Sequence, residues 1–333
     1  MSSTPPSTPP STPWDVRCLP GAGDRVFLVT GGNAGIGYFV AEQLSATGAT
    51  VVLGSRNPAR AGAATDAIRT RVPGARVRAV RLDLADLSSL EAVAGELGAL
   101  GVDRLDAVVL NAGVALDDPP RRETGDGHEL MFGTNHLGHF ALTSWLMPLL
   151  SAAPAARVVT TGSFAAKSER LDLDDLQSRA DYRPKRTYGR SKLAQMYFGV
   201  ELGRRLRAAG STVASVVVHP GGALDSLTPS RPPVHVRGAG ARLGAAPAAL
   251  VLQGKDAGAW PAVRAVLDPA VLDPDVLDPA VRGGGMWEPR VFGLRGEPRR
   301  APLWNHLADP VVAARLWEAS RALTGVDVGA VPG

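Results

Sequence analysis

The sequence predicts an α/β fold, a doubly wound parallel sheet flanked by helices, on the strength of two observations. First, six short apolar runs recur between about residues 24 and 218; they are rich in valine and mostly do not alternate with polar residues. Strands that are buried on both faces have this pattern. Second, amphipathic stretches with a helical period separate these runs. Strands that alternate with helices predict a parallel sheet with helices on both faces.

The six strands are expected at residues 25–30, 50–55, 76–82, 105–110, 156–162 and 213–218. The clearest helical patterns between them occupy residues 37–48, 87–100, 138–150 and 188–210, and two more follow near 257–266 and 311–322. Gly48 and Gly210 stand where helix C-caps belong, because glycine readily adopts the left-handed conformation that ends many helices.

Composition excludes several classes of protein. The chain has 333 residues, 45% of them hydrophobic and 20% charged, which is ordinary globular composition with ample length for a core. The net charge is +4 and the arginines are scattered among acids, which argues against nucleic-acid binding. The one cysteine, Cys18, excludes an intrachain disulfide and fits a cytoplasmic protein. No apolar run approaches the length of a membrane span.

One domain with an N-terminal tail is expected. Residues 1–13, "MSSTPPSTPPSTP", lack the basic start and apolar centre of a signal peptide, so we expect a disordered tail. Residues 14–333 form the single domain, in which regularity weakens after about residue 219. Near residues 266–281, "VLDPAVLDPDVLDPAV" repeats a unit of about five residues whose prolines exclude one continuous helix. This pattern is typical of a lengthened surface loop, and binding of a partner is the alternative.

The first strand leads into "TGGNAGIG", residues 30–37. Glycines at this spacing let the backbone approach a pyrophosphate and point the N–H groups of a helix at it. A glycine-rich turn without a ligand is the alternative interpretation. The motif predicts a Rossmann-type dinucleotide site, with the candidate residues Thr30, Gly31, Asn33, Gly35, Ile36 and Gly37.

The end of the second strand indicates which dinucleotide binds. An acidic residue there would bind the ribose 2′-OH of NAD, whereas this strand ends in Ser55 and Arg56. A hydroxyl and a guanidinium suit a 2′-phosphate, so NADP(H) is favoured over NAD(H), with a solvated Arg56 as the alternative. Asp83 and Leu84 follow the third strand and are placed to contact the adenine, although helix N-capping explains Asp83 equally well.

Two further strand ends carry candidate residues. Asn111, Ala112 and Gly113 follow the fourth strand, where a small turn leaves room for a cofactor ribose. Hydrogen bonding of Asn111 to the strand end is an equally good account. Ser163 follows the fifth strand, at the edge where open α/β sheets bind ligands.

Tyr188 and Lys192 begin the next long helix and share one of its faces, because they are four residues apart. A free phenol has a pKa of about 10 and is a poor base at neutral pH. A nearby ammonium and an oxidised nicotinamide both favour the phenolate, and lowering the pKa by about 3 units needs roughly 4 kcal/mol. The pair follows a sheet-edge serine in a chain with a dinucleotide turn, so it predicts an acid–base site.

Together these motifs resemble the short-chain dehydrogenase/reductase family over about residues 24–219, and more loosely to residue 325. The resemblance rests on "TGGNAGIG", "LNAG", Ser163, "YGRSK" and "HPGG". The stretches "DGHELMFGTNHLGHFALT", "LDLDDL", "GMWEP" and "LWEASRALTGV" are similar to the retinol-dehydrogenase-like and protochlorophyllide-reductase-like branch. The resemblance implies that residues 220–333 form a substrate-pocket extension.

The resemblance implies a catalytic tetrad of Asn135, Ser163, Tyr188 and Lys192. Tyr188 would exchange a proton with the substrate oxygen, and Ser163 would hydrogen-bond to that oxygen. Lys192 would lower the pKa of Tyr188 and hold the nicotinamide ribose, and Asn135 would hold a water in a proton relay. Hydride would pass directly between the nicotinamide and the substrate carbon.

The resemblance also assigns Pro220 and Gly221 to a turn beside the nicotinamide. The family usually has a Thr or Ser a few residues later, whereas this chain has Asp225 followed by Ser226. The histidines of "NHLGH", residues 136 and 139, have no carboxylate or cysteine partner in the pattern, so we expect packing and hydrogen bonding and no metal site.

The predicted activity is NADP(H)-dependent interconversion of a carbonyl and an alcohol. The alternatives are reduction of a C=C bond and a non-catalytic NADP(H)-binding sensor or interaction protein. The expected substrate is a small molecule, an apolar and bulky carbonyl compound or alcohol. Core or inter-subunit packing is slightly favoured over pocket walls for Leu224, Leu227, Trp260 and Trp287. The resemblance allows a homo-oligomer as well as a monomer.

Overall fold

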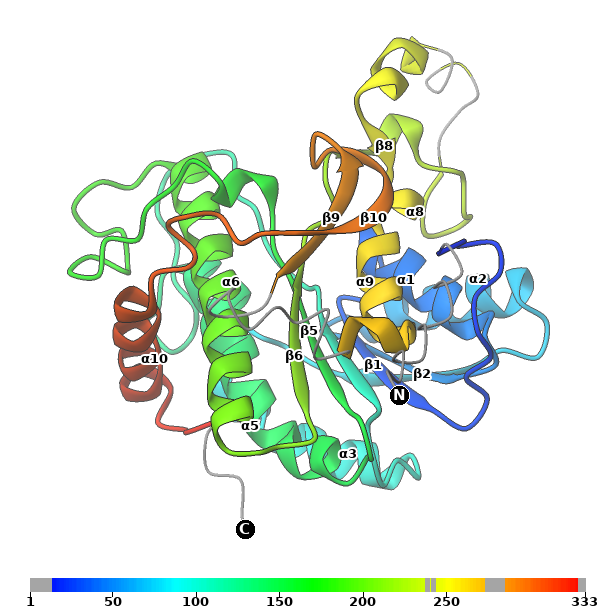
Figure 1. Cartoon of the computed structure of the whole chain (residues 1–333), viewed down its shortest axis with the longest axis horizontal. Coiled ribbons are helices and arrows are strands. Elements are labelled where there is room, and N and C mark those ends of the chain that lie inside the picture. Colours follow the sequence, from blue (N-terminus) through cyan, green and yellow to red (C-terminus); the bar gives the residue numbers. More distant parts are fainter. Residues whose placement is uncertain (1–13, 237–239, 241–243, 273–284, 329–333) are drawn as a thin grey trace, which may run out of the picture.

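An eight-stranded sheet forms the centre of the structure, a computed structural model that describes residues 14–236, 240, 244–272 and 285–328 (Figure 1). The strands are β1 (Val26–Thr30), β2 (Thr50–Ser55), β3 (Arg76–Arg81), β4 (Ala107–Leu110), β5 (Arg157–Thr161), β6 (Ala214–Val218), β9 (Met286–Val291) and β10 (Arg295–Ala301). Their spatial order is β10-β9-β6-β5-β4-β1-β2-β3, and every pairing is parallel except that of β10 with β9. The predicted fold class and all six predicted strands are confirmed.

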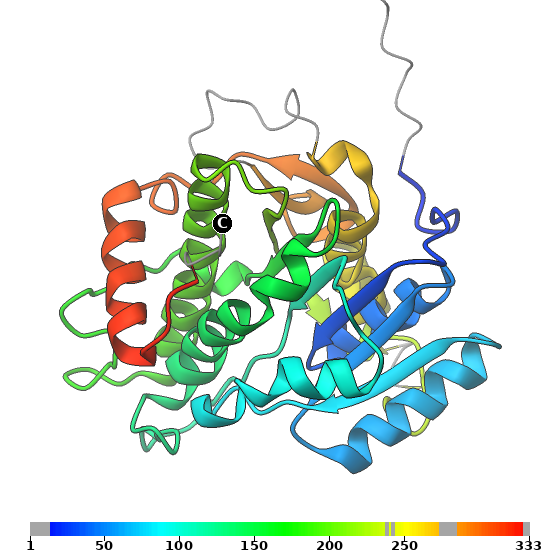
Figure 2. The same ribbon diagram turned by 90° about the horizontal axis from the view of Figure 1, so that it is seen from below.

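Helices cover both faces of this sheet (Figures 1 and 2). On one face lie α1 (Gly35–Ser45), α2 (Pro58–Arg71) and α9 (Trp260–Leu267). On the other lie α3 (Ala92–Ala99), α5 (Gly138–Ser151) and α6 (Pro184–Ala208), with α10 (Pro310–Thr324) packed against α6. Shorter elements are α4 (Leu130–Phe132), α8 (Lys255–Gly258) and a small parallel pair, β7 (Ala223–Leu224) with β8 (Gln253–Gly254). The two helix layers account for the non-alternating apolar strands, since both faces of the sheet are buried.

Helix ends agree with the sequence in most places. Gly48 and Gly210 both have positive φ, at 81° and 66°, just beyond the ends of α1 and α6, as predicted. The start of α6 differs from the prediction, because the helix begins at Pro184 and Tyr188 therefore lies in its second turn. Proline suits this first helical position, since its missing N–H would have no partner there.

The hairpin of β9 and β10 was not predicted. It adds a parallel strand beside β6 and an antiparallel edge strand beyond it. Pro289 and Pro298 face each other across the hairpin and interrupt the strand pattern in the sequence. Proline has no N–H to donate to a neighbouring strand, so it is tolerated only near the edge of a sheet. Its presence in the sequence also argues against a strand, which is why the hairpin was not predicted.

Two predicted features lie outside the described residues. These are the tail of residues 1–13 and most of the five-residue repeat, of which only residues 266–272 are described, in the end of α9 and a 3₁₀ turn at Pro269–Leu272. Within the described ranges, none of the helices combines the length and the apolar character needed to cross a bilayer.

The turn between β1 and α1 is tightly packed. Gly31 has a φ of +66°, and a Cβ added to it would lie 3.0 Å from the backbone of Ala112. A Cβ on Gly37 would lie 2.4 Å from the Asn111 amide nitrogen and 2.5 Å from the Gly31 carbonyl oxygen. The glycines thus allow three backbone segments to meet where larger residues would separate them.

We therefore predict that Gly37→Ala destabilises the protein by about 1–3 kcal/mol, because the added methyl group overpacks rigid backbone. Gly62→Ala is the matched control, since this position in α2 has open space around it and alanine favours helix. Urea unfolding measures both variants. An unchanged midpoint for Gly37→Ala would show that the turn relaxes freely.

Candidate active site

The predicted site residues meet at the carboxyl edge of the sheet. Strands β1, β4, β5 and β6 are neighbours in the sheet, in that reverse spatial order, and they run parallel. The segments that follow them therefore lie side by side (Figure 1). These segments carry the glycine turn of residues 30–37, the turn of residues 111–113, Ser163, and the turn at Pro220 and Gly221. The helix α6 adds Tyr188 and Lys192.

The N-terminus of α1 fits a pyrophosphate. Its N-cap residue, Ala34, has no side chain that could accept hydrogen bonds from the first helical N–H groups. By contrast, Asn57 caps α2 and Asp309 caps α10 with side-chain oxygens. Gly35 has a φ of +57° and open space beside it. Uncapped N–H groups beside open space are the donor set that binds phosphate at a helix N-terminus.

The end of β2 carries positive charge. Arg56 is exposed, and none of the residues that the structure describes hydrogen-bonds to its guanidinium. Ser55 is buried, and its hydroxyl donates to the Asn57 carbonyl oxygen at 3.2 Å. Arg81 pairs with Ser55 in the strand register and is also exposed. The region is thus basic, without an acid at the end of β2.

Asp83 and Leu84 have local roles in the structure. The Asp83 carboxylate accepts a hydrogen bond from the Ala85 N–H at 3.1 Å, which caps a turn and not the start of a helix. Leu84 packs closely on α5, because a Cβ on Gly138 would lie 2.3 Å from the Leu84 carbonyl oxygen. Contact of either residue with adenine stays a prediction.

Asn111 ties β4 to β1. Its amide nitrogen donates to the Thr30 carbonyl oxygen at 3.1 Å, and its backbone N–H donates to the Thr30 hydroxyl at 2.9 Å. The strand-capping interpretation of Asn111 is therefore confirmed. A Cβ on Gly113 would lie 3.1 Å from the Asn135 side-chain oxygen, so a larger residue would crowd this turn.

Ser163 lies beside Tyr188. Ser163 follows β5 in extended conformation, and its hydroxyl accepts from the Ala165 N–H at 3.2 Å. Burial raises the pKa of Tyr188 above that of a free phenol, and a hydrogen bond from Ser163 partly opposes this rise. The phenol is therefore held as a protonated acid within reach of the serine hydroxyl.

Lys192 is buried, with 4% of its surface exposed. Its ammonium donates to the Thr161 carbonyl oxygen at 2.6 Å and to the Gln195 side-chain oxygen at 2.5 Å. Burial lowers the pKa of Lys192 to about 7. Burial and the Ser163 contact account for the shift in the Tyr188 pKa. Lowering of that pKa by Lys192 together with a bound nicotinamide stays a prediction.

Asn135 is fully buried in a π-helical turn, residues 133–137, between α4 and α5. Its side-chain oxygen accepts from the Val114 N–H at 2.7 Å. Its amide nitrogen donates to the Val114 carbonyl oxygen at 3.0 Å and to the Ser191 hydroxyl at 2.9 Å. Protein groups thus engage the whole side-chain amide, and Asn135 joins the turn after β4 to the helix of Tyr188.

His136 and His139 pack and hydrogen-bond, as predicted. The His136 ring lies 2.7 Å from the Ser320 hydroxyl of α10, and the His139 ring lies 2.9 Å from the Thr30 hydroxyl. Burial lowers the pKa of each to about 3, so both rings are neutral. No group of three metal-binding side chains occurs in the described part of the chain.

The turn at Pro220 and Gly221 is held by groups that the sequence analysis missed. The buried His219 ring accepts from the Gly221 N–H at 3.2 Å and lies 3.2 Å from the Glu288 carboxylate of β9. Gly221 has a φ of +72°, and a Cβ there would lie 2.4 Å from the Leu294 carbonyl oxygen. The hydrogen bond from His219 lowers the pKa of Glu288.

The segment after this turn departs from the family pattern at Asp225. Its carboxylate lies 2.5 Å from the Lys255 ammonium of α8. Of the four candidate wall residues, Trp287 is a core residue with the Arg264 guanidinium 4.4 Å from its ring centroid. The other three, Leu224, Leu227 and Trp260, are half-buried.

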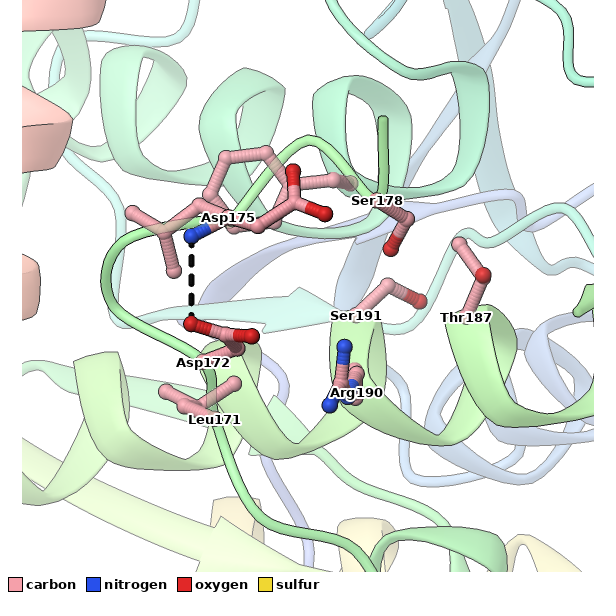
Figure 3. Close-up of a pocket in the computed structure, with 9 residues that line it drawn as sticks. Leu171, Asp172, Asp175, Ser178, Thr187, Arg190 and Ser191 are labelled. Carbon is pink, nitrogen blue, oxygen red and sulfur yellow. Dashed lines mark hydrogen bonds between the residues drawn. The ribbon is translucent and has the colours of Figure 1, made fainter. Parts of the chain in front are cut away.

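A small pocket lies between α6 and the loop of residues 171–178 (Figure 3). Arg190, Ser191 and Thr187 of α6 face the loop that carries Asp172 and Asp175. The cavity volume is about 10 Å³, which is room for a single water. The pocket is therefore a packing feature of the "LDLDDL" loop and not a substrate site.

Arg231 fastens the segment after Pro220 to α1. Its guanidinium donates to both carboxylate oxygens of Glu42, at 2.6 and 2.9 Å. The Tyr38 hydroxyl donates to the same carboxylate at 3.0 Å. The guanidinium also lies 5.5 Å from the Phe39 ring centroid. This bidentate, largely buried pair sets where the segment crosses the helix.

Known proteins resemble this chain over most of its length. The sequence model for short chain dehydrogenase matches residues 25–230. Polyprenol dehydrogenase of Mus musculus is 36% identical over 315 residues, which cover 93% of this chain and 87% of that protein. Retinol dehydrogenase 14 of Homo sapiens is 39% identical over 210 residues, 59% of this chain and 61% of that protein. The crystal structure of an uncharacterised protein from Mycobacterium Paratuberculosis has a TM-score of 0.72 at 33% identity, covering 95% of this chain and 99% of that one.

We predict that Arg231→Met destabilises the protein by about 3 kcal/mol, because it leaves the Glu42 carboxylate buried without its cation. Adding Glu42→Gln should restore part of this loss, since the uncompensated charge is then removed. Arg290→Met is the control, because the Arg290–Glu297 pair is 3.8 Å long and exposed. Urea unfolding of the variants measures these effects. Equal losses for Arg231→Met and Arg290→Met would contradict the prediction.

Proposed function

Since the chain belongs to the short-chain dehydrogenase family, in its retinol-dehydrogenase-like branch, we propose that this oxidoreductase interconverts a carbonyl and an alcohol with NADP(H), using Tyr188 as its general acid and base. The observation that carries the proposal is the convergence of Ser163, Tyr188 and Lys192 beside the glycine turn. Ser163 follows β5, and Tyr188 and Lys192 lie on α6, 25 and 29 positions later in the sequence. All three nevertheless lie at the edge of the sheet where open α/β folds bind ligands.

The residues of this chain supply the proton chemistry. When bound, the nicotinamide supplies the hydride for reduction or takes it up during oxidation. In reduction, the O–H bond of Tyr188 breaks as its proton passes to the carbonyl oxygen of the substrate, so that C=O becomes CH–OH. In oxidation, the Tyr188 oxygen takes the proton back. Ser163 donates a hydrogen bond to the same substrate oxygen and stabilises the charge that develops on it.

Lys192 is placed to act on the cofactor side of Tyr188. An ammonium has three donor hydrogens, and Thr161 and Gln195 accept two of them. The third is left for a hydroxyl of the nicotinamide ribose or for the phenolate. A positive charge there favours the ionised form of Tyr188, which is the form needed for oxidation.

The basic end of β2 supports NADP(H). Arg56 is exposed with its donors available, and Arg81 lies on the neighbouring strand. A 2′-phosphate carries about two negative charges and suits such a site, whereas the 2′-hydroxyl of NAD gains little from it. The proposed substrate is an apolar carbonyl compound or alcohol, in keeping with the polyprenol and retinol dehydrogenases that the chain resembles.

We predict that Tyr188→Phe lowers kcat/KM at least about 1,000-fold with little change in cofactor affinity, because it removes the proton donor and leaves the ring in place. The assay follows NADPH oxidation with aldehydes, ketones and enones, and product analysis distinguishes an alcohol from a saturated ketone. Full turnover by Tyr188→Phe would refute the mechanism. A saturated ketone as the product would instead establish C=C reduction.

We predict that Arg56→Asp raises the KM for NADPH about 10- to 100-fold, because a carboxylate replaces a charge-assisted donor to the 2′-phosphate. The KM for NADH should stay the same or fall. Arg60→Asp, in the exposed first turn of α2, is the control for a general loss of positive charge. Equal effects of Arg56→Asp on both cofactors would remove the support for NADP(H).

A further inference from the structure

A buried chain of hydrogen bonds runs from Lys192 to the glycine turn through two residues outside the tetrad, Gln195 and His139. Gln195 lies on α6, one turn after Lys192, and is fully buried. Its side-chain oxygen accepts from the Lys192 ammonium, and its amide nitrogen donates to the Leu110 carbonyl oxygen at the end of β4, at 3.0 Å. The ammonium determines this orientation, because a flipped amide would point its N–H groups at a cation.

His139 continues the chain from α5. Its Nδ1 atom lies 3.1 Å from the Gln195 amide nitrogen and 2.9 Å from the Asn135 carbonyl oxygen. A neutral ring carries one N–H, so Nδ1 either accepts from the Gln195 amide or donates to the Asn135 carbonyl, and the chain of hydrogen bonds runs through the first of these tautomers. Its Nε2 atom lies 2.9 Å from the Thr30 hydroxyl. The ring is fully buried, so each of its nitrogen atoms needs a partner inside the protein, and each has one.

Thr30 ends the chain at the cofactor turn. Its hydroxyl oxygen accepts from the N–H groups of Asn111 and Ala112, each at 2.9 Å. Thr30 is also the first residue of the glycine turn, and it is fully buried. One hydroxyl thus joins the ends of β1 and β4, and His139 joins that hydroxyl to α5 and α6.

We propose that Gln195 and His139 are positioning residues of the reaction. They fix the position of the Lys192 ammonium relative to the strand ends that bind the cofactor. This inference rests on the proposed function, since it assigns to the pair a role toward Lys192. In the proposed arrangement, neither residue touches the substrate. Gln195 sets the position of the ammonium, and His139 sets the positions of Gln195, the Asn135 carbonyl and Thr30 relative to one another.

Few titratable groups lie near the contact between the Lys192 ammonium and Gln195. Among the described residues, His139 of α5 and Tyr188 of α6 are the titratable groups that face Lys192, and β5 contributes the uncharged carbonyl of Thr161. His139 is neutral because burial lowers its pKa to about 3. The charged form of Lys192 therefore depends on neutral acceptors, of which Gln195 is the one carried by a side chain.

The test measures the pKa of Lys192 directly by NMR. The chain has four lysines, Lys167, Lys185, Lys192 and Lys255. The full protein labelled with ¹³Cε-lysine therefore gives a small set of NMR signals. The signal that disappears in Lys192→Arg belongs to Lys192. In Gln195→Leu, the pKa of Lys192 should fall by about one unit, because the ammonium loses an acceptor. In Gln195→Glu, which keeps the shape of the side chain, it should rise, because a carboxylate favours the charged form. The kcat/KM of Gln195→Leu should fall about tenfold or more at neutral pH.

The matched pair of histidine variants separates positioning from packing. His139→Phe and His136→Phe each replace a buried ring on neighbouring turns, but His136 faces Ser320 and not Lys192. His139→Phe should lower kcat about tenfold and shift the Lys192 signal, whereas His136→Phe should leave both unchanged.

Two results would overturn the inference: a Lys192 pKa that is the same in both Gln195 variants and the wild type, or equal kinetic losses in the two histidine variants. A wild-type protein that binds NADPH but turns over no substrate would instead refute the proposed function. The NMR shifts remain decisive in that case, because they need no turnover. If Gln195→Leu does not fold, Gln195→Glu and His139→Phe still decide the question.

Discussion

The structure depends on how buried strand ends satisfy their hydrogen bonds. A parallel sheet that is covered on both faces leaves N–H and C=O groups at its carboxyl edge without a ladder partner, and each unpaired group would cost about 1–3 kcal/mol. Here the Thr30 hydroxyl accepts two backbone N–H groups, and the amides of Asn111 and Gln195 cover two carbonyl oxygens. These bonds make the ligand-binding edge a polar core. The groups that shape the glycine turn and the groups that hold Lys192 therefore meet at the end of β4, at Leu110 and Asn111.

Burial at this edge acts on Tyr188 and Lys192 in opposite directions. It raises the pKa of the phenol and lowers that of the ammonium to about 7, so both groups tend toward their neutral forms. A neutral, protonated Tyr188 is the form that donates a proton, which suits reduction of a carbonyl. Oxidation needs the phenolate, and that form needs a positive charge nearby. In the proposed reaction, a charged Lys192 favours the phenolate of Tyr188, and the acceptors Thr161 and Gln195 favour the charged form of Lys192.

Much of the fold and the site could be predicted from the sequence, because the six central strands and the glycine turn carry local signals. Valine-rich runs mark strands buried on both faces, and Tyr188 and Lys192 share a helix face by spacing alone. Gln195 gave a weaker signal, a polar residue in the apolar stretch "LAQMYF", one helical turn after Lys192. Its partner His139 lies 56 positions away, and no local pattern predicts such a contact. The hairpin of β9 and β10 was missed because its prolines interrupt the strand pattern.

The hairpin of β9 and β10 holds the turn that follows β6. The family model matches residues 25–230, and the segments beyond residue 230 include Arg231, which fastens the loop to α1, and Glu288 and Leu294 of the hairpin region. Glu288 holds His219, and the Leu294 carbonyl oxygen accepts from the Gly222 N–H, so the hairpin fixes the turn at Pro220 and Gly221. Residues beyond 230 therefore fix the backbone at Pro220 and Gly221, the turn that the proposed function puts beside the nicotinamide.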